Sequence, residues 1–251
     1  MKVQKLGVSL MDVIVQKATV RMRFAGALLL LAGVQYVVLE YVAAAAWPHP
    51  GYSYVVNFIS DLGNPVADDV YAGRLIDSPH HVAMNIAFVA QGALFLIAGV
   101  LLLTSMIRGR LDRLLLGLVI AHSVGVILVG FFHESSANEH NGVLLVHGIG
   151  AAATILAGNI VAIVVGVQGA KFGVAQGLRW TFGAVGILGL ASFVLLQADR
   201  PLYDSAGGVP ERGAVYSILL FEIVLGTALL VRGTCHAPVS SVQSVRERLT
   251  S

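Results

Sequence analysis

The sequence predicts an all-α, polytopic membrane protein: a bundle of six transmembrane helices with both termini in the cytoplasm. Apolar residues make up 57% of the 251 residues and charged residues only 12%, against about 45 to 50% and about 25% in a typical soluble domain. Six apolar segments of about 20 residues each occupy nearly the whole chain. Lys and Arg also lie mostly on one side of these segments. A water-soluble fold could not cover its surface with so few charges.

Local signals mark the ends of the expected spans. The helix-breaking run from Pro48 to Gly51 closes the first span. The second is expected to start with Ser78 as the N-cap residue and Pro79 at the first helical position. The six expected spans are residues 24–47, 78–107, 114–132, 142–167, 180–197 and 210–231.

The distribution of charge predicts the orientation of the bundle. Of the 16 Lys and Arg residues, only Arg74, Arg200 and Arg212 fall on one side of the spans, and the other thirteen fall on the opposite side. Cytoplasmic loops accumulate Lys and Arg, so the basic side is the inner one. Nine of the 14 acidic residues lie on the outer side: Asp61, Asp68, Asp69, Asp77, Glu134, Glu139, Asp199, Asp204 and Glu211. We therefore expect a multi-pass protein of the cell membrane whose chemistry is on its outer face.

The chain length leaves room for one membrane domain and two short flanking segments. Residues 1–23 are expected to form a cytoplasmic segment, either as an interfacial helix or as an unstructured tail. Residues 24–231 form the six-helix domain, and residues 232–251 form a polar cytoplasmic tail that contains the single cysteine, Cys235. One cysteine excludes an intrachain disulfide.

Charge and composition also limit the expected partners. The formal net charge of +2 argues neither for nor against nucleic acid. Nucleic acid is not an expected partner because no basic patch with interleaved aromatic residues is present. Membrane lipids are expected partners. A second membrane protein or another copy of this chain remains open as a further partner.

One outer segment carries a family resemblance. Residues 57–65 read Asn-Phe-Ile-Ser-Asp-Leu-Gly-Asn-Pro, which resembles the Asn-x-Ile-Ser-x-Leu-Gly element of the domain-of-unknown-function 998 family, a group of six-span membrane proteins. Further similar features are Asn85, the run Gly130-Phe131-Phe132, His147, and the pair Glu211 and Arg212. Where family members commonly have Pro and then an acidic residue, this chain has His133 and Glu134. The resemblance implies a fold and a membrane location, and no catalytic residue.

The segment from Asn57 to Pro65 has two interpretations. Ser60 or Asp61 can cap a short helix, and Gly63 with Asn64 can end it. In the first interpretation this turn closes the outer mouth of the bundle. In the second, Asp61 is a general base or a metal ligand, which requires a chemically complementary neighbour.

Histidines supply candidate neighbours for Asp61. His81, His133, His140 and His147 all lie near the outer end of the spans, and with Asp61, Glu134 or Glu139 they could provide the three or four ligands of a zinc site. No short His-x-x-x-His spacing occurs. The alternative is a set of solvated or hydrogen-bonded histidines at the membrane interface.

Two carboxyl groups and one histidine lie deep within the expected spans. Glu40 and Glu222 are intramembrane carboxyl groups, and such groups are protonated, paired or exposed to water. Glu222 is therefore either a structural hydrogen-bonding residue or part of a pocket or proton path. His122, near the middle of the third span, is expected to be buried, neutral and bonded to Asn159 or another helix.

Three functions remain open on these observations. The first is binding of lipid or another envelope component at the outer polar mouth, with candidate residues Asn57, Ser60, Asp61, Asn85, Glu211 and Arg212. The second is an intramembrane lipid hydrolase or transferase, dependent on a metal or on acid and base groups, with candidate catalytic residues Asp61, His81, His147 and Glu222. The third is proton-coupled transport through Glu40, His122 and Glu222, for which the sequence shows no inverted repeat.

Overall fold

The computed structural model describes residues 2–48, 50–104, 109–198 and 200–232. Within these ranges the chain forms seven α-helices, three short 3₁₀ helices and one β-hairpin. The helices are α1 (Lys2–Ala45), α2 (His81–Leu103), α3 (Arg110–Phe131), α4 (Val143–Gln168), α5 (Gln176–Ala198), α6 (Arg200–Ala206) and α7 (Gly208–Arg232). The smaller elements are η1 (Ser60–Gly63), β1 (Asp69–Tyr71), β2 (Arg74–Ile76), η2 (Ser136–Asn138) and η3 (Gly169–Phe172).

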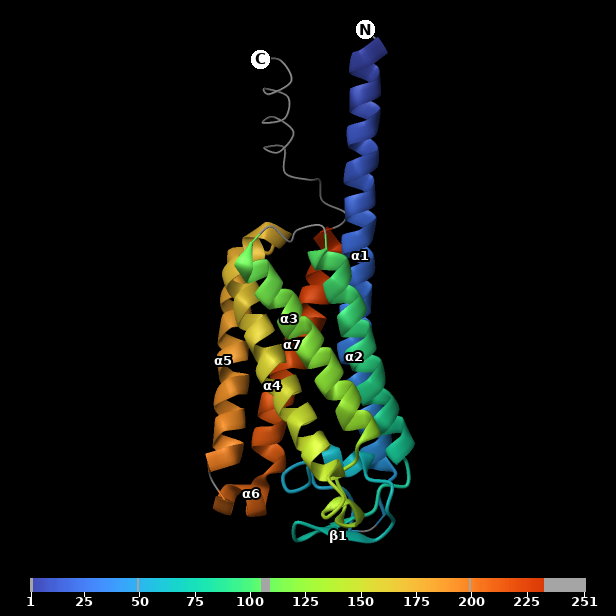
Figure 1. The fold of residues 1–251 in the computed structure, drawn as a ribbon, viewed down its shortest axis with the longest axis vertical. Coiled ribbons are helices and arrows are strands. Elements are labelled where there is room, and N and C mark those ends of the chain that lie inside the picture. The colour runs from blue at the N-terminus through green and yellow to red at the C-terminus, as the bar shows by residue number, and fades with distance from the viewer. Residues whose placement is uncertain (1, 49, 105–108, 199, 233–251) are drawn as a thin grey trace.

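Six of these helices are long and apolar enough to cross a membrane, as the sequence predicts. They form a closed ring in which each helix packs on the next, in the order α1, α2, α3, α4, α5 and α7, and α7 returns to α1. Helices α4 and α7 also touch across the ring. The short helix α6 lies at one end, between α5 and α7 (Figure 1).

Two details differ from the sequence expectations. The residues ahead of the first expected span continue its helix, because α1 runs without a break from Lys2 and projects beyond the other helices (Figure 1). The N-terminal segment is thus joined to the first span instead of forming a separate surface helix. Helix α2 starts at His81, because the Ser78 hydroxyl donates to the carbonyl of Leu62 (2.7 Å) and does not cap the helix. The tail 233–251, with Cys235, lies outside the described residues.

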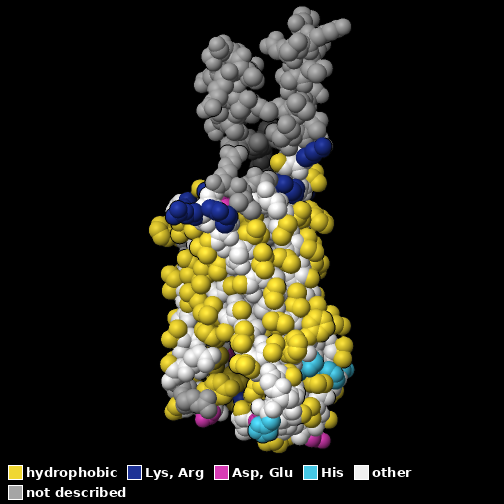
Figure 2. All heavy atoms as spheres, viewed as in Figure 1, with side chains coloured by type: hydrophobic (Ala, Val, Ile, Leu, Met, Phe, Trp, Pro, Cys, Tyr) yellow, Lys and Arg dark blue, Asp and Glu magenta, His cyan; other side chains and the backbone are white. Residues whose placement is uncertain are grey.

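The two ends of the bundle differ in charge. Helix α1 begins and α7 ends at the same end, opposite the hairpin and η1 (Figure 1). Figure 2 shows Lys and Arg gathered at the first of these ends and His with acidic side chains at the other. The excess of positive charge in cytoplasmic loops predicts that the end with η1 faces outward, and it is called the outer end below.

The loop between α1 and α2 folds over the outer end of the bundle, and residues 46–80 are called the outer cap below. Its hairpin pairs Val70 with Leu75 in antiparallel register. The two-residue turn is formed by Ala72 and Gly73, with φ angles of 48° and 76°, as a type I′ turn requires. Asp69 ties the hairpin to η2, since it accepts hydrogen bonds from the backbone N–H (3.1 Å) and the hydroxyl of Ser136.

The interior has an inner and an outer apolar cluster. The inner cluster includes Leu29, Phe95 and Phe221, and the outer cluster includes Tyr36, Phe88 and residues of η1. Glycines allow close helix contacts, as is common in membrane bundles. A Cβ atom on Gly125 would lie 2.6 Å from the carbonyl oxygen of Gly150, so α3 and α4 can pack this closely only without a side chain there.

Candidate functional site

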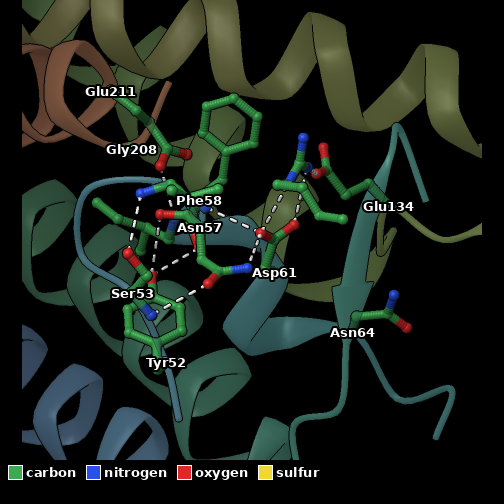
Figure 3. Close-up of polar contacts among 12 residues, drawn as sticks. Tyr52, Ser53, Asn57, Phe58, Asp61, Asn64, Glu134, Gly208 and Glu211 are labelled. Carbon is green, nitrogen blue, oxygen red and sulfur yellow. Dashed lines mark hydrogen bonds and ion pairs between the residues drawn. The ribbon is translucent and has the colours of Figure 1, made fainter. Parts of the chain in front are cut away.

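A buried ion pair holds the outer cap together. Asp61 lies in η1, and Arg74 starts β2. Nε and Nη2 of Arg74 each donate to the Asp61 carboxylate at 3.0 Å. The same carboxylate accepts the backbone N–H of Phe58 (2.9 Å) and the amide of Asn57 (3.3 Å). Figure 3 shows Asn57, Phe58 and Asp61 in this tight turn. Both carboxylate oxygens of Asp61 are thus occupied, which makes it an anchor for the turn.

Glu134 and His147 continue this polar cluster toward the bundle. Nη2 of Arg74 lies 3.4 Å from Glu134, and Nε2 of His147 lies 3.5 Å from the other oxygen of Glu134. Nδ1 of His147 is 2.7 Å from the carbonyl of Phe132, so it carries the proton and leaves Nε2 as an acceptor. Burial, reinforced by the nearby Asp61 carboxylate and opposed by Arg74, raises the pKa of Glu134 to about 7.

The raised pKa of Glu134 predicts a pH-dependent stability. The folded protein holds the Glu134 proton more tightly than the unfolded chain does. The contribution of this group to the free energy of unfolding is therefore fully present below about pH 4.5 and is lost as the pH rises through about 7. Glu134→Gln should therefore stabilise the protein by on the order of 3 kcal/mol at pH 8 and change little at pH 4. Thermal unfolding in detergent at both pH values measures this. An unchanged dependence of Tm on pH in Glu134→Gln would assign the effect to other groups.

Arg212 forms a second anchor between α7 and the outer cap. Its Nη1 donates to the carbonyl oxygens of Tyr54 (2.9 Å), Asn57 (2.9 Å) and Gly208 (3.1 Å). Its Nη2 donates to the Glu40 carboxylate (3.2 Å) and to the hydroxyl of Tyr52. Arg212 thus neutralises the buried intramembrane acid Glu40 and holds the start of the cap in place.

A cavity lies beneath the outer cap, inside the ring of helices. Its upper end is lined by Ser60, His147 and Glu211, and its lower end by Gln91 and His122. Its walls are mostly apolar and include Val126, Val129, Ile155, Val215, Ile218 and Leu219. The volume is about 50 Å³, enough for roughly three or four waters at about 10 to 15 Å³ each. Figure 2 shows this end of the molecule hollowed between α6 and the outer loops.

Two polar side chains, Gln91 and His122, form the floor of the cavity near the middle of the membrane, and Glu222 lies behind the floor in contact with Gln91. Nδ1 of His122 is 2.9 Å from the carbonyl of Thr154, so it donates there and Nε2 is an acceptor. The Gln91 amide donates to Nε2 of His122 (2.9 Å) and to the Glu222 carboxyl group (2.6 Å). Oε1 of Gln91 and Oε2 of Glu222 have no hydrogen-bond partner among the described residues. The floor and the acid behind it therefore have two buried acceptor atoms to spare.

The remaining candidates from the sequence divide between cap and cavity. Asn85 joins α2 to the cap by donating to the carbonyl of Gly63 (2.9 Å). Glu211, at the start of α7, accepts a hydrogen bond from the backbone N–H of Ile59 (2.5 Å), and its side chain lies close to the turn in Figure 3. His122 is buried and bonded to neighbouring helices as expected, but not to Asn159, whose amide donates to the carbonyls of Ile155 and Ala214.

The histidines proposed as metal ligands are not assembled into a site. Nδ1 of His81 contacts the carbonyl of Ser78 (3.0 Å), His140 is exposed, and His147 is engaged with Phe132 and Glu134. Burial lowers the pKa of His133, which keeps this loop histidine neutral. Among the residues that the structure describes, no three His, Cys, Asp or Glu side chains lie close enough to hold a metal ion.

Tyr52 and Gln91 were not predicted as residues of this site. Tyr52 bonds the cap through the carbonyl of Phe58 (2.7 Å) and accepts from Arg212. Gln91 lies in the middle of an apolar span, where a polar amide is itself a signal that a buried partner is required. Tyr52 had no comparable signal, because aromatic residues are common at membrane interfaces.

Comparison with known proteins agrees with the resemblance in the outer segment. Residues 24–228 match the family described as protein of unknown function (DUF998). No curated protein and no solved structure matches the chain. The matched range includes the outer cap, the cavity and at least the greater part of each of the six spans, and the chain therefore belongs to the DUF998 family.

Proposed function

We propose that the protein binds a small amphipathic molecule, from membrane lipid or another envelope component, in the cavity beneath its outer cap. The observation that carries this proposal is a cavity with apolar walls and polar groups at both ends, the usual character of small-molecule sites. Spare buried acceptors at the floor support it further, because a buried polar atom without a partner costs roughly 1 to 3 kcal/mol. With a volume of about 50 Å³, the cavity accommodates the end group of a ligand and not a whole lipid.

The enzymatic alternative receives less support from the geometry. Asp61, its proposed general base, has both carboxylate oxygens engaged by Arg74 and backbone or amide donors. His81 contacts its own turn, and Glu222 is bonded to Gln91 behind the cavity floor. Of the four candidate catalytic residues, His147 alone lines the cavity, and its Nδ1 is bonded to the carbonyl of Phe132.

The transport alternative is supported only in part. His122 and Glu222 are indeed neighbours, with 3.9 Å between Nε2 and Oε1. Glu40 instead pairs with Arg212, and the hydroxyl of Tyr216 donates its one hydrogen between the two Glu40 oxygens (2.9 and 3.0 Å). On the inner side of the floor, a second cavity of about 40 Å³ is lined, among the described residues, by apolar side chains and Gly99 alone. A polar path across the membrane would have to cross this apolar layer.

Filling the cavity tests the proposed binding role. Ala151 lines the cavity from α4, so Ala151→Leu occupies its space. We expect this variant to lose co-purifying ligand while its Tm stays the same or rises, because the added side chain enters an existing void. The measurement is mass spectrometry of small molecules extracted from the purified protein.

Leu156→Phe is the matched control for this experiment. Leu156 lies on the same helix and is 41% exposed on the outside of the bundle. This control should retain the same molecules as the wild type. Equal retention in Ala151→Leu and the wild type would contradict binding in the cavity.

A further inference from the structure

One face of α7 runs the length of the cavity and carries a carboxyl group near each end. Glu211, Val215, Ile218 and Leu219 all line the cavity. Glu222 follows at the same helical spacing, eleven residues and about three turns after Glu211, which is an axial rise of about 16 Å. It contacts the cavity through Gln91, to which it is hydrogen bonded at 2.6 Å. The ligand space therefore has one carboxyl group at its top, Glu211, and a second one, Glu222, directly behind its floor.

The hydrogen bonds at the floor determine which kind of group is missing there. Both N–H bonds of the Gln91 amide are used, one by His122 and one by Glu222. His122 is neutral in this arrangement, since its Nδ1 donates to the carbonyl of Thr154 and its Nε2 accepts from Gln91. The two unpartnered atoms, Oε1 of Gln91 and Oε2 of Glu222, are both oxygens on side chains that are at least 98% buried. With Glu222 ionised, this group of side chains lacks a hydrogen-bond donor.

The charges around the cavity favour a cationic donor over a neutral one. None of the residues that line it in the described structure is Lys or Arg. Arg212 is turned toward the cap, where it bonds three carbonyl oxygens and Glu40. Glu222 therefore has no permanent cation near it, and an intramembrane carboxyl group is costly unless it is paired or protonated. A cationic donor would give a hydrogen bond to each unpartnered oxygen and would also pair with the charge of Glu222.

We propose that the cavity floor, formed by Gln91 and His122 with Glu222 bonded behind Gln91, binds a primary ammonium group at the end of a short hydrocarbon chain. The ammonium donates to Oε1 of Gln91 and to Glu222, and the chain lies against Val215 and Ile218. This inference rests on the proposed function and specifies the ligand chemistry of the same cavity. A chain of about four carbons with its nitrogen matches a space of three or four waters.

Two small probes that differ in charge test the ammonium site. n-Butylamine, charged at pH 7, and 1-butanol have the same length. We expect the wild type to bind butylammonium about tenfold or more tightly than butanol, as hydrogen bonds to a charged group imply. Equilibrium dialysis of the protein in detergent against each isotope-labelled probe, with detergent alone as the blank, measures both affinities.

Variants assign the preference to Glu222. Glu222→Gln should abolish the tenfold preference for the amine, whereas Thr227→Ala, on the exposed side of the same helix, should keep it. Equal affinity of the wild type for the two probes overturns the ammonium site, as does a preserved preference in Glu222→Gln. The wild-type comparison needs no variant, so it decides the matter even where Glu222→Gln does not fold.

The same experiment separates this inference from the proposed function. Ala151→Leu should block both probes, because it fills the shared cavity. If both probes bind equally and Ala151→Leu blocks both, the cavity remains a ligand site and only the ammonium assignment fails. If neither probe binds, or if Ala151→Leu binds both as the wild type does, the cavity itself is not the site.

Discussion

Arg74→Met is expected to destabilise the protein by about 3 to 5 kcal/mol, the usual cost of removing one partner of a buried ion pair. The Arg74 and Asp61 side chains are 6% and 0% exposed, so Asp61 would remain as a buried charge without its main counter-ion. The substitution also removes a cation that lies 4.1 Å from the centre of the Phe58 ring. Chemical unfolding of the purified protein measures the loss.

Two further variants make this test specific to the ion pair. Arg113→Met changes an exposed arginine at the inner end of α3, where we expect an effect within about 0.5 kcal/mol. Adding Asp61→Asn to Arg74→Met should recover part of the loss, because the uncompensated charge is gone. A cost for Arg74→Met no larger than that for Arg113→Met would show that the pair does not hold the cap.

Arg212→Met is expected to have a similar or larger effect, again at least about 3 kcal/mol. One guanidinium satisfies three carbonyl oxygens as well as Glu40, whose side chain is only 2% exposed. All four acceptors lose a donor together in this variant. We expect the chain around Tyr54 to become sensitive to protease while the spans remain resistant, and limited proteolysis with mass spectrometry detects the cleavage.

The charge and the geometry of Arg212 can be separated. Arg212→Lys keeps the charge but cannot reach several acceptors with a rigid planar group, so it should recover only part of the stability. Glu40→Gln in the Arg212→Met background should also recover part, since it removes the unpaired acid. Wild-type protease resistance of the loop in Arg212→Met would contradict its role as the second anchor.

The six spans could be predicted from the sequence because the signal for each is strong and local. A helix that crosses a membrane needs about 20 apolar residues, and the breaks between spans contain charged residues, Pro or Gly. The continuous helix α1 was not predicted, because Lys2, Lys5 and Lys17 interrupt the apolar pattern ahead of the first span. Charge in that segment affects its position relative to the membrane more than its ability to form a helix.

The hairpin of the outer cap was missed because its turn has a weak sequence signal. Type I′ turns strongly prefer Asn-Gly or Asp-Gly, whereas this turn has Ala72 and Gly73. The pairing of Arg74 with Asp61 depends on that hairpin, which turns the arginine back toward η1. Without the hairpin, Arg74 could be placed only in a loop.

The partners of the intramembrane acids could not be predicted from the position of each acid along its span. Glu40 and Glu222 were correctly identified as buried groups that need partners. Which partner each finds depends on the ring order, since α1 packs on α7 and brings Glu40 to Arg212. Gln91 reaches Glu222 from α2 across the interior. Such pairings follow from the packing of whole helices, and no local pattern in this single sequence encodes them.

The most direct test of the account is an experimental density map of the protein purified without removal of lipid, at a resolution that shows the Gln91 and Glu222 side chains. We predict density for an elongated ligand in the cavity between Glu211 and Gln91, with one end in contact with Glu222, and no such density in Ala151→Leu. A wild-type cavity that contains only ordered water, or that has closed so that Gln91 bonds to protein alone, would contradict the proposed function.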